Sequence, residues 1–213
     1  MCGRFTYLFT WAEIHEQLSA FLDSLRDDAG PEISGQPHRY NIAPTQPILT
    51  IHREGGTYRP QLMRWGLVPE WVKDPRDFPL IINARAESMA EKASFRTALK
   101  NRRCIVPASG YYEWRRNEDG SKTPHYITLK DGKPMLFAGF HSTWTGPDGE
   151  EIDTAAIVTI ASEGEMKNLH DRTPAILDDK QAATWLDTAN VGGATANTLI
   201  ARLKIAETKF HAV

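Results

Sequence analysis

The sequence contains only two cysteines, Cys2 and Cys104, among its 213 residues. Two cysteines exclude a disulfide framework and a cysteine-rich zinc site, and they are typical of a reducing compartment. The longest mostly apolar runs, such as residues 155–161, are far too short to cross a bilayer. No basic segment followed by an apolar stretch opens the chain, so we predict no signal peptide. We therefore expect a cytoplasmic protein with no membrane partner.

Metal-ligating patterns are also missing. The seven histidines include no pair with the three-residue separation that places two imidazoles on one face of a helix. We therefore expect neither a metal ion nor a cofactor, and any chemistry has to come from side chains or from the chain terminus.

The overall charge is small, and a formal net charge of −2 excludes a molecule that binds nucleic acid by its total charge. The distribution is uneven, however. Residues 1–130 carry 18 Lys and Arg against 15 Asp and Glu, and 13 of those 18 are Arg. The planar donor fork of Arg matches phosphate oxygens, so a local phosphate-binding face is one interpretation. On charge alone, solvated surface arginines are the favoured interpretation.

Short strand-like runs joined by tight turns dominate the middle of the chain. Gly55-Gly56, Asp119-Gly120 and Asp131-Gly132 are hairpin turn signals. Strands joined in this way argue against a doubly wound parallel sheet. We predict an α+β fold, a single β-rich domain over residues 1–213 with a mostly antiparallel or mixed sheet and peripheral helices. The predicted strands are residues 3–6, 48–52, 58–65, 104–107, 111–115, 125–129, 135–140 and 155–161.

Four helices are predicted around this sheet. Thr10 and Glu13 form a capping-box pattern, and apolar residues recur at helical spacing from Trp11 to Leu25. Further helices are expected over residues 89–100, over residues 179–186 with Asp178 as the N-cap, and over residues 194–207.

Cys2 is the most informative residue, because it directly follows the initiator Met and its small side chain permits removal of that Met. The mature chain would then begin with a free α-amine and a thiol on one residue. An α-amine has a pKa of about 8, so a useful fraction is unprotonated at neutral pH. Such an aminothiol attacks aldehydes, first as a Schiff base and then by closing a thiazolidine ring. Taken alone, Cys2 is more simply a small buried hydrophobe.

Four polar residues stand where a purely structural chain would not need them. Asn83 and Arg85 follow the apolar run 80–82, where a strand could direct them into a pocket, although taken alone a simple strand-to-helix turn is the favoured interpretation. Glu113 stands among aromatic residues, which predicts partial desolvation and a raised pKa suited to proton transfer. A solvated Glu on the polar face of an alternating strand is an equally good interpretation of the same pattern. His170 is suited to proton exchange near neutral pH, but a lone histidine is more often structural.

Two tryptophans flank a Gly and a Pro in the segment 65–71. Trp65 ends a predicted strand and is expected in the core. Trp71 is the better candidate for stacking on bases, as aromatic side chains do in proteins that bind single strands.

Taken together, these segments resemble the SRAP family, the SOS-response-associated peptidases, which are understood as abasic-site processing proteins. Six blocks occur in the family's order and extend from residue 1 to about residue 190. The blocks are Met1-Cys2-Gly3-Arg4-Phe5, residues 39–44, residues 65–71, residues 82–87, residues 104–114 and His170-Asp171-Arg172-Thr173-Pro174.

The resemblance implies a monomeric, chromosome-associated protein that recognises abasic sites in single-stranded DNA and crosslinks to them through its N-terminal Cys. It implies that Cys2 is the nucleophile, that Asn83 holds it, that Glu113 assists proton transfer and that His170 is a general acid and base. It also implies roles in DNA binding, which fall to Arg4 and Arg85 on phosphates and to Trp71 as a stacking side chain. An imine at the sugar can also promote β-elimination, so weak lyase activity is a secondary prediction.

Two other functions remain open on the sequence. The first is a cysteine peptidase, or an autopeptidase, in which Cys2 and His170 form the nucleophile and its base. The second is a passive binder of single-stranded DNA, which would use Arg4, Arg85 and Trp71 and would not need Cys2.

Overall fold

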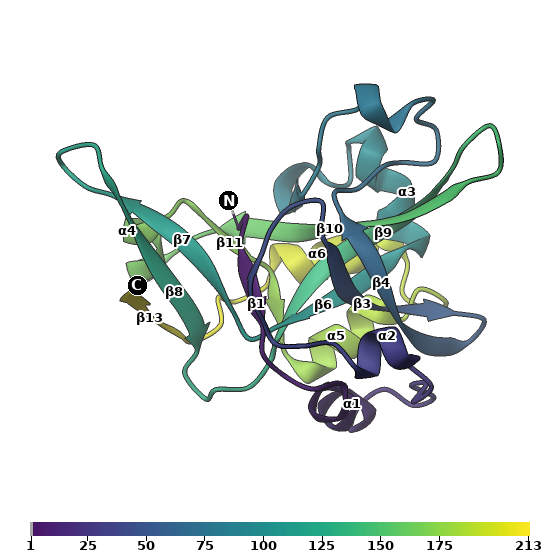
Figure 1. Cartoon of the computed structure of the whole chain (residues 1–213), viewed down its shortest axis with the longest axis horizontal. Coiled ribbons are helices and arrows are strands. Elements are labelled where there is room, and N and C mark those ends of the chain that lie inside the picture. The colour runs from purple at the N-terminus through teal and green to yellow at the C-terminus, as the bar shows by residue number, and fades with distance from the viewer. Residues whose placement is uncertain (1) are drawn as a thin grey trace.

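The computed structural model describes residues 2–213, and within them the chain forms two β-sheets surrounded by short helices (Figure 1). The helices are α1 (Trp11–Ser19), α2 (Pro31–Ser34), α3 (Ala93–Asn101), α4 (Gly164–Leu169), α5 (Asp179–Leu186) and α6 (Gly193–Ala201), with 3-10 turns η1 (Pro75–Asp77) and η2 (Ala86–Ser88). The strands are β1 (Phe5–Tyr7), β2 (Arg39–Ile42), β3 (Pro47–Glu54), β4 (Thr57–Trp65), β5 (Asn83–Arg85), β6 (Arg103–Ala108), β7 (Gly110–Arg116), β8 (Lys122–Leu129), β9 (Met135–Thr145), β10 (Glu151–Ala161), β11 (Arg172–Pro174), β12 (Ile176–Leu177) and β13 (Thr208–Ala212).

The smaller sheet has five strands in the order β13-β8-β7-β1-β2, and every pairing in it is antiparallel. The N-terminal strand β1 lies between β7 and β2, so it is held by two neighbours rather than at an edge. The β7–β8 hairpin extends from this sheet at the left of Figure 1.

The larger sheet has eight strands and closes on itself. Its order runs β11-β10-β4-β3-β6-β9-β12, and β9 also pairs with β10, so five strands complete a ring. Closure leaves no exposed edge among those five strands. Only the pairings of β10 with β4 and β5 are parallel. The predicted α+β fold with a mostly antiparallel or mixed sheet is therefore confirmed.

Aromatic side chains join the two sheets. Phe5 in β1 packs edge-on against Trp65 at 5.2 Å and against Phe137 at 6.1 Å between ring centroids. All three rings are fully buried, which confirms that Trp65 belongs to the core. Because burial of each ring removes a large apolar surface from water, this cluster fixes the N-terminal strand on the closed sheet. The chain segment just before β1 is fixed with it.

A buried arginine holds the helices on one side of the closed sheet. Arg103 is fully buried and donates to the carbonyls of Leu99 (2.7 Å), Lys100 (3.1 Å), Trp185, Asp187 (3.2 Å) and Val191 (2.7 Å). These carbonyls lie at the C-terminal ends of α3 and α5 and just beyond, where helix carbonyls lack internal partners. Burial lowers the pKa of Arg103 to about 10.

The helix predictions are partly correct. The Thr10 capping box is present and α1 begins at Trp11, but the helix ends at Ser19 instead of continuing to Leu25. Leu22 is still buried beyond the helix end, so the apolar spacing reports burial and not helix length. The helix over residues 89–100 begins later, at Ala93. The helix over 179–186 and its Asp178 cap are confirmed.

The last predicted helix is too long. The helix α6 ends at Ala201, and residues 208–212 form strand β13 along the edge of β8. Pairing with β8 satisfies backbone groups that a sheet edge would expose. The free energy of these backbone hydrogen bonds outweighs the local helix propensity of the segment. The sequence also gave no signal for the short elements α2, α4, β2, β5, β11 and β12.

None of the helices formed by residues 2–213 is both long and apolar enough to cross a membrane.

Candidate active site

Cys2 lies three residues before Phe5, the first residue of β1, and is fully buried. Its position follows from the aromatic cluster around Phe5, because only two residues separate Cys2 from that anchor. Burial raises the pKa of the Cys2 thiol well above its usual value, and the charge of Glu113 raises it further. The thiol is therefore protonated at neutral pH. The prediction that Met1 is removed concerns a residue outside those that the structure describes.

Asn83 contacts Cys2 from the closed sheet. Its Nδ2 donates to the Cys2 carbonyl oxygen at 2.9 Å. Its Oδ1 is buried and has no hydrogen-bond partner among the described residues. Asn83 begins strand β5, which pairs in parallel with β10, and this pairing directs the side chain towards the N-terminal segment. A buried amide oxygen without a partner is a vacant acceptor, and it lies on the residue that already binds Cys2.

Glu113 is the buried carboxyl of the site. It lies in β7 with a side chain that is 3% exposed, between the outward-facing residues Tyr112 and Trp114. Burial raises the pKa of Glu113 to about 7. A carboxyl with that pKa is present in both protonation states at neutral pH, so it can accept and return a proton.

His170 faces Glu113 at the end of α4, with its Nε2 3.8 Å from Glu113 Oε2. The backbone N–H of Arg172 donates to His170 Nδ1 at 3.0 Å. Nδ1 also lies 3.3 Å from the Arg172 carbonyl oxygen. The contact with the N–H is the shorter of the two, so we assign Nδ1 as the acceptor and place the proton of the neutral ring on Nε2, towards Glu113. Burial lowers the pKa of His170, which favours this neutral form.

Arg172 is held in place by a second set of contacts. Its guanidinium binds Glu87 through two hydrogen bonds of 2.6 and 3.0 Å and also donates to the Thr159 carbonyl. These contacts fix the backbone that sets the His170 tautomer. They also commit the Arg172 side chain to protein partners and away from phosphate. The Glu87–Arg172 pair was not predicted, because its two members are far apart in the sequence.

A buried hydroxyl pair lies on the same side of β7. The Tyr111 hydroxyl and Thr173 Oγ1 are 2.9 Å apart, and both side chains are buried. Burial raises the pKa of Tyr111, and the charges of Cys2 and Glu113 raise it further. Tyr111 therefore lies within electrostatic range of the thiol and stays protonated beside it. Both residues fall within motifs noted in the sequence, but nothing there indicated that they pair.

The two predicted phosphate ligands lie on different elements. Arg4 stands before β1, and its Nη1 donates to Asn41 Oδ1 at 3.0 Å. Arg85 is exposed at the end of β5, two residues after Asn83. It lines one depression with His170 and an adjoining one with Asn83 and Lys92. Lys92 is thus a further cation beside the site, and the sequence did not single it out.

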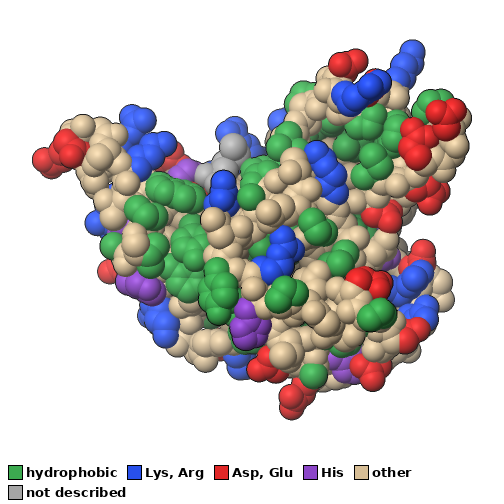
Figure 2. All heavy atoms as spheres, in the orientation of Figure 1, with side chains coloured by type: hydrophobic (Ala, Val, Ile, Leu, Met, Phe, Trp, Pro, Cys, Tyr) green, Lys and Arg blue, Asp and Glu red, His purple; other side chains and the backbone are tan. Residues whose placement is uncertain are grey.

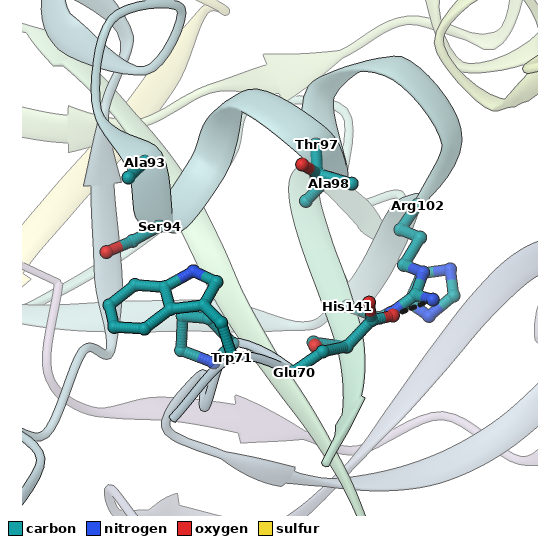
Figure 3. Close-up of a pocket in the computed structure, with 10 residues that line it drawn as sticks. Glu70, Trp71, Ala93, Ser94, Thr97, Ala98, Arg102 and His141 are labelled. Atoms are coloured by element: carbon teal, nitrogen blue, oxygen red, sulfur yellow. Dashed lines mark ion pairs between the residues drawn. The ribbon is translucent and has the colours of Figure 1, made fainter. Parts of the chain in front are cut away.

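Trp71 lies at the far end of this surface and is 59% exposed. Its ring packs edge-on against Phe78 at 5.6 Å. Figure 3 shows the indole beside Ala93 and Ser94 of α3, with the Glu70–Arg102 ion pair at the other end of the same depression. Ser94 also lines the depression that contains Asn83 and Arg85. A continuous surface therefore connects Trp71 through Arg85 to His170.

Figure 2 shows the molecule hollowed along its upper edge, between the β7–β8 hairpin and the lobe that carries α3. The grouped residues offer a thiol, an amide acceptor, a carboxyl that titrates near neutral pH and a neutral imidazole. Such a set can move protons during attack on an electrophilic carbon. Within residues 2–213, no group of three or more His, Cys, Asp or Glu side chains is arranged to hold a metal ion.

Comparisons with known proteins agree on one family. The family model described as SOS response associated peptidase (SRAP) matches residues 1–213. The abasic site processing protein YoqW of Bacillus subtilis is 41% identical over 190 residues, which cover 89% of this chain and 82% of YoqW. The abasic site processing protein YedK of Escherichia coli is 31% identical over 189 residues, covering 87% of this chain and 79% of YedK. A crystal structure of a Bacteroides thetaiotaomicron protein aligns with a TM-score of 0.83 at 27% identity, covering 100% of this chain and 92% of its own.

Proposed function

The chain belongs to the SOS response associated peptidase (SRAP) family, and from that premise we propose that it captures abasic sites in single-stranded DNA through Cys2. The reaction requires removal of Met1, which leaves Cys2 with a free α-amine beside its thiol. The names of YoqW and YedK indicate the lesion. The observation that carries the proposal is the grouping around Cys2 of the Asn83 amide and the Glu113–His170 pair.

The open-chain form of an abasic site is an aldehyde at C1′, and a 1,2-aminothiol bonds to it twice. The amine nitrogen attacks the carbonyl carbon, and the resulting carbinolamine loses water to give an imine. The thiol sulfur then adds to the imine carbon while the thiol proton passes to nitrogen. The product is a thiazolidine, and one water molecule is released in total.

Burial of the Cys2 thiol supports the amine as the first nucleophile. The raised pKa keeps the thiol protonated, whereas an α-amine has a usual pKa of about 8 and is partly unprotonated at neutral pH. Glu113, with a pKa of about 7, can take a proton from the ammonium form and return it to the departing hydroxyl. His170, with Nε2 protonated, is suited to donate its proton to the ring oxygen of the sugar, which leaves C1′ and becomes a hydroxyl as the ring opens.

Asn83 would orient the nucleophile. Its Nδ2 holds the Cys2 carbonyl, and its vacant Oδ1 is available to accept a hydrogen bond from the α-amine. A fixed amine directs its lone pair at one position, which reduces the entropy that the reaction would otherwise lose. Arg4 and Arg85 would bind the flanking phosphates, which position a strand without reading its sequence. Trp71 would stack on a neighbouring base.

The peptidase alternative is less well supported by the same geometry. A cysteine peptidase needs a thiolate with a lowered pKa, and here burial and Glu113 both raise the thiol pKa. A passive DNA binder would retain its activity without Cys2. Weak lyase activity follows from the imine stage, since an imine at C1′ promotes β-elimination of the 3′ phosphate.

Denaturing gel electrophoresis tests the proposal directly. The Met1-processed protein is mixed with a single-stranded oligonucleotide that carries one abasic site, and undamaged DNA serves as one control. We expect a slower band that survives denaturation, is lost in Cys2→Ser and is kept in Cys104→Ala, which removes the only other thiol. Absence of the band, with a mature N-terminus verified by mass spectrometry, would contradict the proposal. An unchanged band in Cys2→Ser would contradict it equally.

A further inference from the structure

The face of β7 opposite Glu113 is exposed and carries side chains that the proposed reaction does not use. Successive residues in a strand point to opposite faces, so burial of Tyr111 and Glu113 directs their neighbours outward. The same alternation in β8 buries His125 and Ile127. Three cross-strand pairs result, and together they form what we name the outer ribbon face: Tyr112 with Tyr126, Trp114 with Pro124, and Arg116 with Lys122.

The aromatic rings of this face are held in fixed positions. The rings of Tyr112 and Tyr126 lie 5.0 Å apart, and His211 of β13 lies 6.0 Å beyond Tyr126. The Tyr126 hydroxyl is 2.7 Å from Thr6 Oγ1, and a Cβ on Gly110 would meet the Tyr126 ring at 2.6 Å. The ring of Tyr126 therefore lies along the sheet over Gly110, and one of its faces points away from the protein.

We propose that the outer ribbon face is a stacking platform for unpaired nucleotides of the strand that carries the lesion. The inference rests on the proposed function for the identity of that strand. An antiparallel sheet with aromatic side chains on its central strands is a known way to stack unpaired bases. Each base presents a flat face to a ring regardless of its sequence, which suits a protein that must act at any position.

The charge beside the rings favours a nucleic acid over an apolar protein partner. Arg116 and Lys122 are cross-strand neighbours at the outer end of the face, and Arg4, just before β1, lies beside Tyr112. Figure 2 shows hydrophobic side chains gathered over β7 and β8, with Lys and Arg side chains near the end of the hairpin. Glu118 and Asp119 occupy the turn beyond them. These two carboxylates would repel phosphates. We therefore expect the DNA strand to cross the sheet and not to continue past the tip of the hairpin.

The platform adjoins the reaction site through the N-terminal segment. The backbone N–H of Tyr112 donates to the Arg4 carbonyl at 2.9 Å. Cys2 stands two residues before Arg4, a span of about 7 Å in an extended chain. One nucleotide covers a similar distance. A DNA strand that is bonded to Cys2 and bound by Arg4 at the next phosphate would therefore reach the Tyr112 ring. The rings would hold the bases that flank the lesion on one side.

Trp114 provides the sharpest test, because the two tyrosines also anchor the sheet through their hydroxyls and Trp114 is 38% exposed. The measurement is fluorescence anisotropy with an undamaged single-stranded oligonucleotide at fixed salt. We expect Trp114→Ala to weaken binding about tenfold, as the loss of one stacked base predicts. Trp114→Phe keeps a ring and should retain most of the affinity.

A charge variant tests the same face independently. Lys122→Ala should reduce the slope of log K against log salt by about 0.7, the value for one phosphate contact on a single strand. Lys180→Ala removes an exposed lysine from α5 and should leave the slope unchanged. Unchanged affinity in Trp114→Ala with an unchanged slope in Lys122→Ala would overturn the inference. A wild-type dimer that dissociates in Trp114→Ala would also overturn it and would assign the face to a second copy of the chain.

A crosslinking assay with a shorter oligonucleotide distinguishes failure of the stacking platform from failure of the proposed function. An oligonucleotide with only one nucleotide on each side of the abasic site reaches Cys2 and the adjoining Tyr112 ring but not Trp114, which lies further along β7. We expect Trp114→Ala to crosslink this short DNA as wild type does. If wild type forms no crosslink with either length, the proposed function fails. If wild type crosslinks both and Trp114→Ala binds long DNA normally, only the platform fails.

Discussion

At the scale of single residues, some contacts of the site can be predicted from the sequence and others cannot. The aromatic neighbours of Glu113 predict a desolvated carboxyl, and its side chain is indeed almost fully buried, with a pKa raised by that burial. The tautomer of His170 is set by the backbone of Arg172, two residues away. The ion pair between Arg172 and Glu87 joins residues that are far apart in the sequence. No local pattern predicts it, and it is seen only in the folded chain.

The raised pKa of Glu113 makes stability depend on pH. The folded-state pKa is about 7 and the unfolded value is about 4.3, so the folded state binds the extra proton between them. Stability should therefore fall as pH rises from about 4.5 to about 7, by at most about 4 kcal/mol. Glu113→Gln should lack this fall. Urea unfolding near pH 5 and near pH 7.5 measures it.

The control for this measurement is Glu118→Gln, which changes an exposed carboxyl on the hairpin turn. It should keep the pH dependence of wild type. The same loss of stability between the two pH values in wild type and in Glu113→Gln would show that Glu113 is not protonated in the folded state.

At the scale of elements, local patterns located most strands and helix starts, and tertiary pairing determined the rest. The capping box at Thr10 and the N-cap at Asp178 were predicted from the sequence because the interacting groups lie three residues apart. The strand β13 was missed because its pairing with β8 joins residues about 80 positions apart. The closure of the larger sheet by β9 and β10 was equally invisible, since no local signal reports which strands become neighbours.

Arg103 is expected to determine how α3 and α5 are held against the sheet. Arg103→Met keeps much of the side-chain volume but leaves the five carbonyls without their donor. Buried acceptors without a partner are costly, so the free energy of unfolding should fall by about 3 kcal/mol or more. Arg96→Met, an exposed change on α3, is the matched control and should stay near wild type. A loss equal to that of the control would contradict this role.

At the scale of the whole molecule, a net charge of −2 coexists with a proposed DNA-binding role. The two are compatible because the cations of interest lie near Cys2 or along the adjoining surfaces, and not evenly over the protein. Arg4 lies near Cys2, Arg85 and Lys92 line the depressions beside Asn83, and Arg116 lies on the outer ribbon face. The excess of Arg in the first 130 residues is consistent with this arrangement, but on charge alone it favoured solvated surface arginines.

The central claim is that both the amine and the thiol of Cys2 bond to the lesion, and the intact mass of the adduct tests it most directly. The claim predicts the mass of the Met1-processed protein plus the abasic DNA minus one water molecule, unchanged after borohydride treatment. It also predicts no adduct when the Cys2 amine is acetylated. An adduct that loses no water would indicate a bond through sulfur alone. A gain of two hydrogens with borohydride would indicate an imine without ring closure, and either result would contradict the claim.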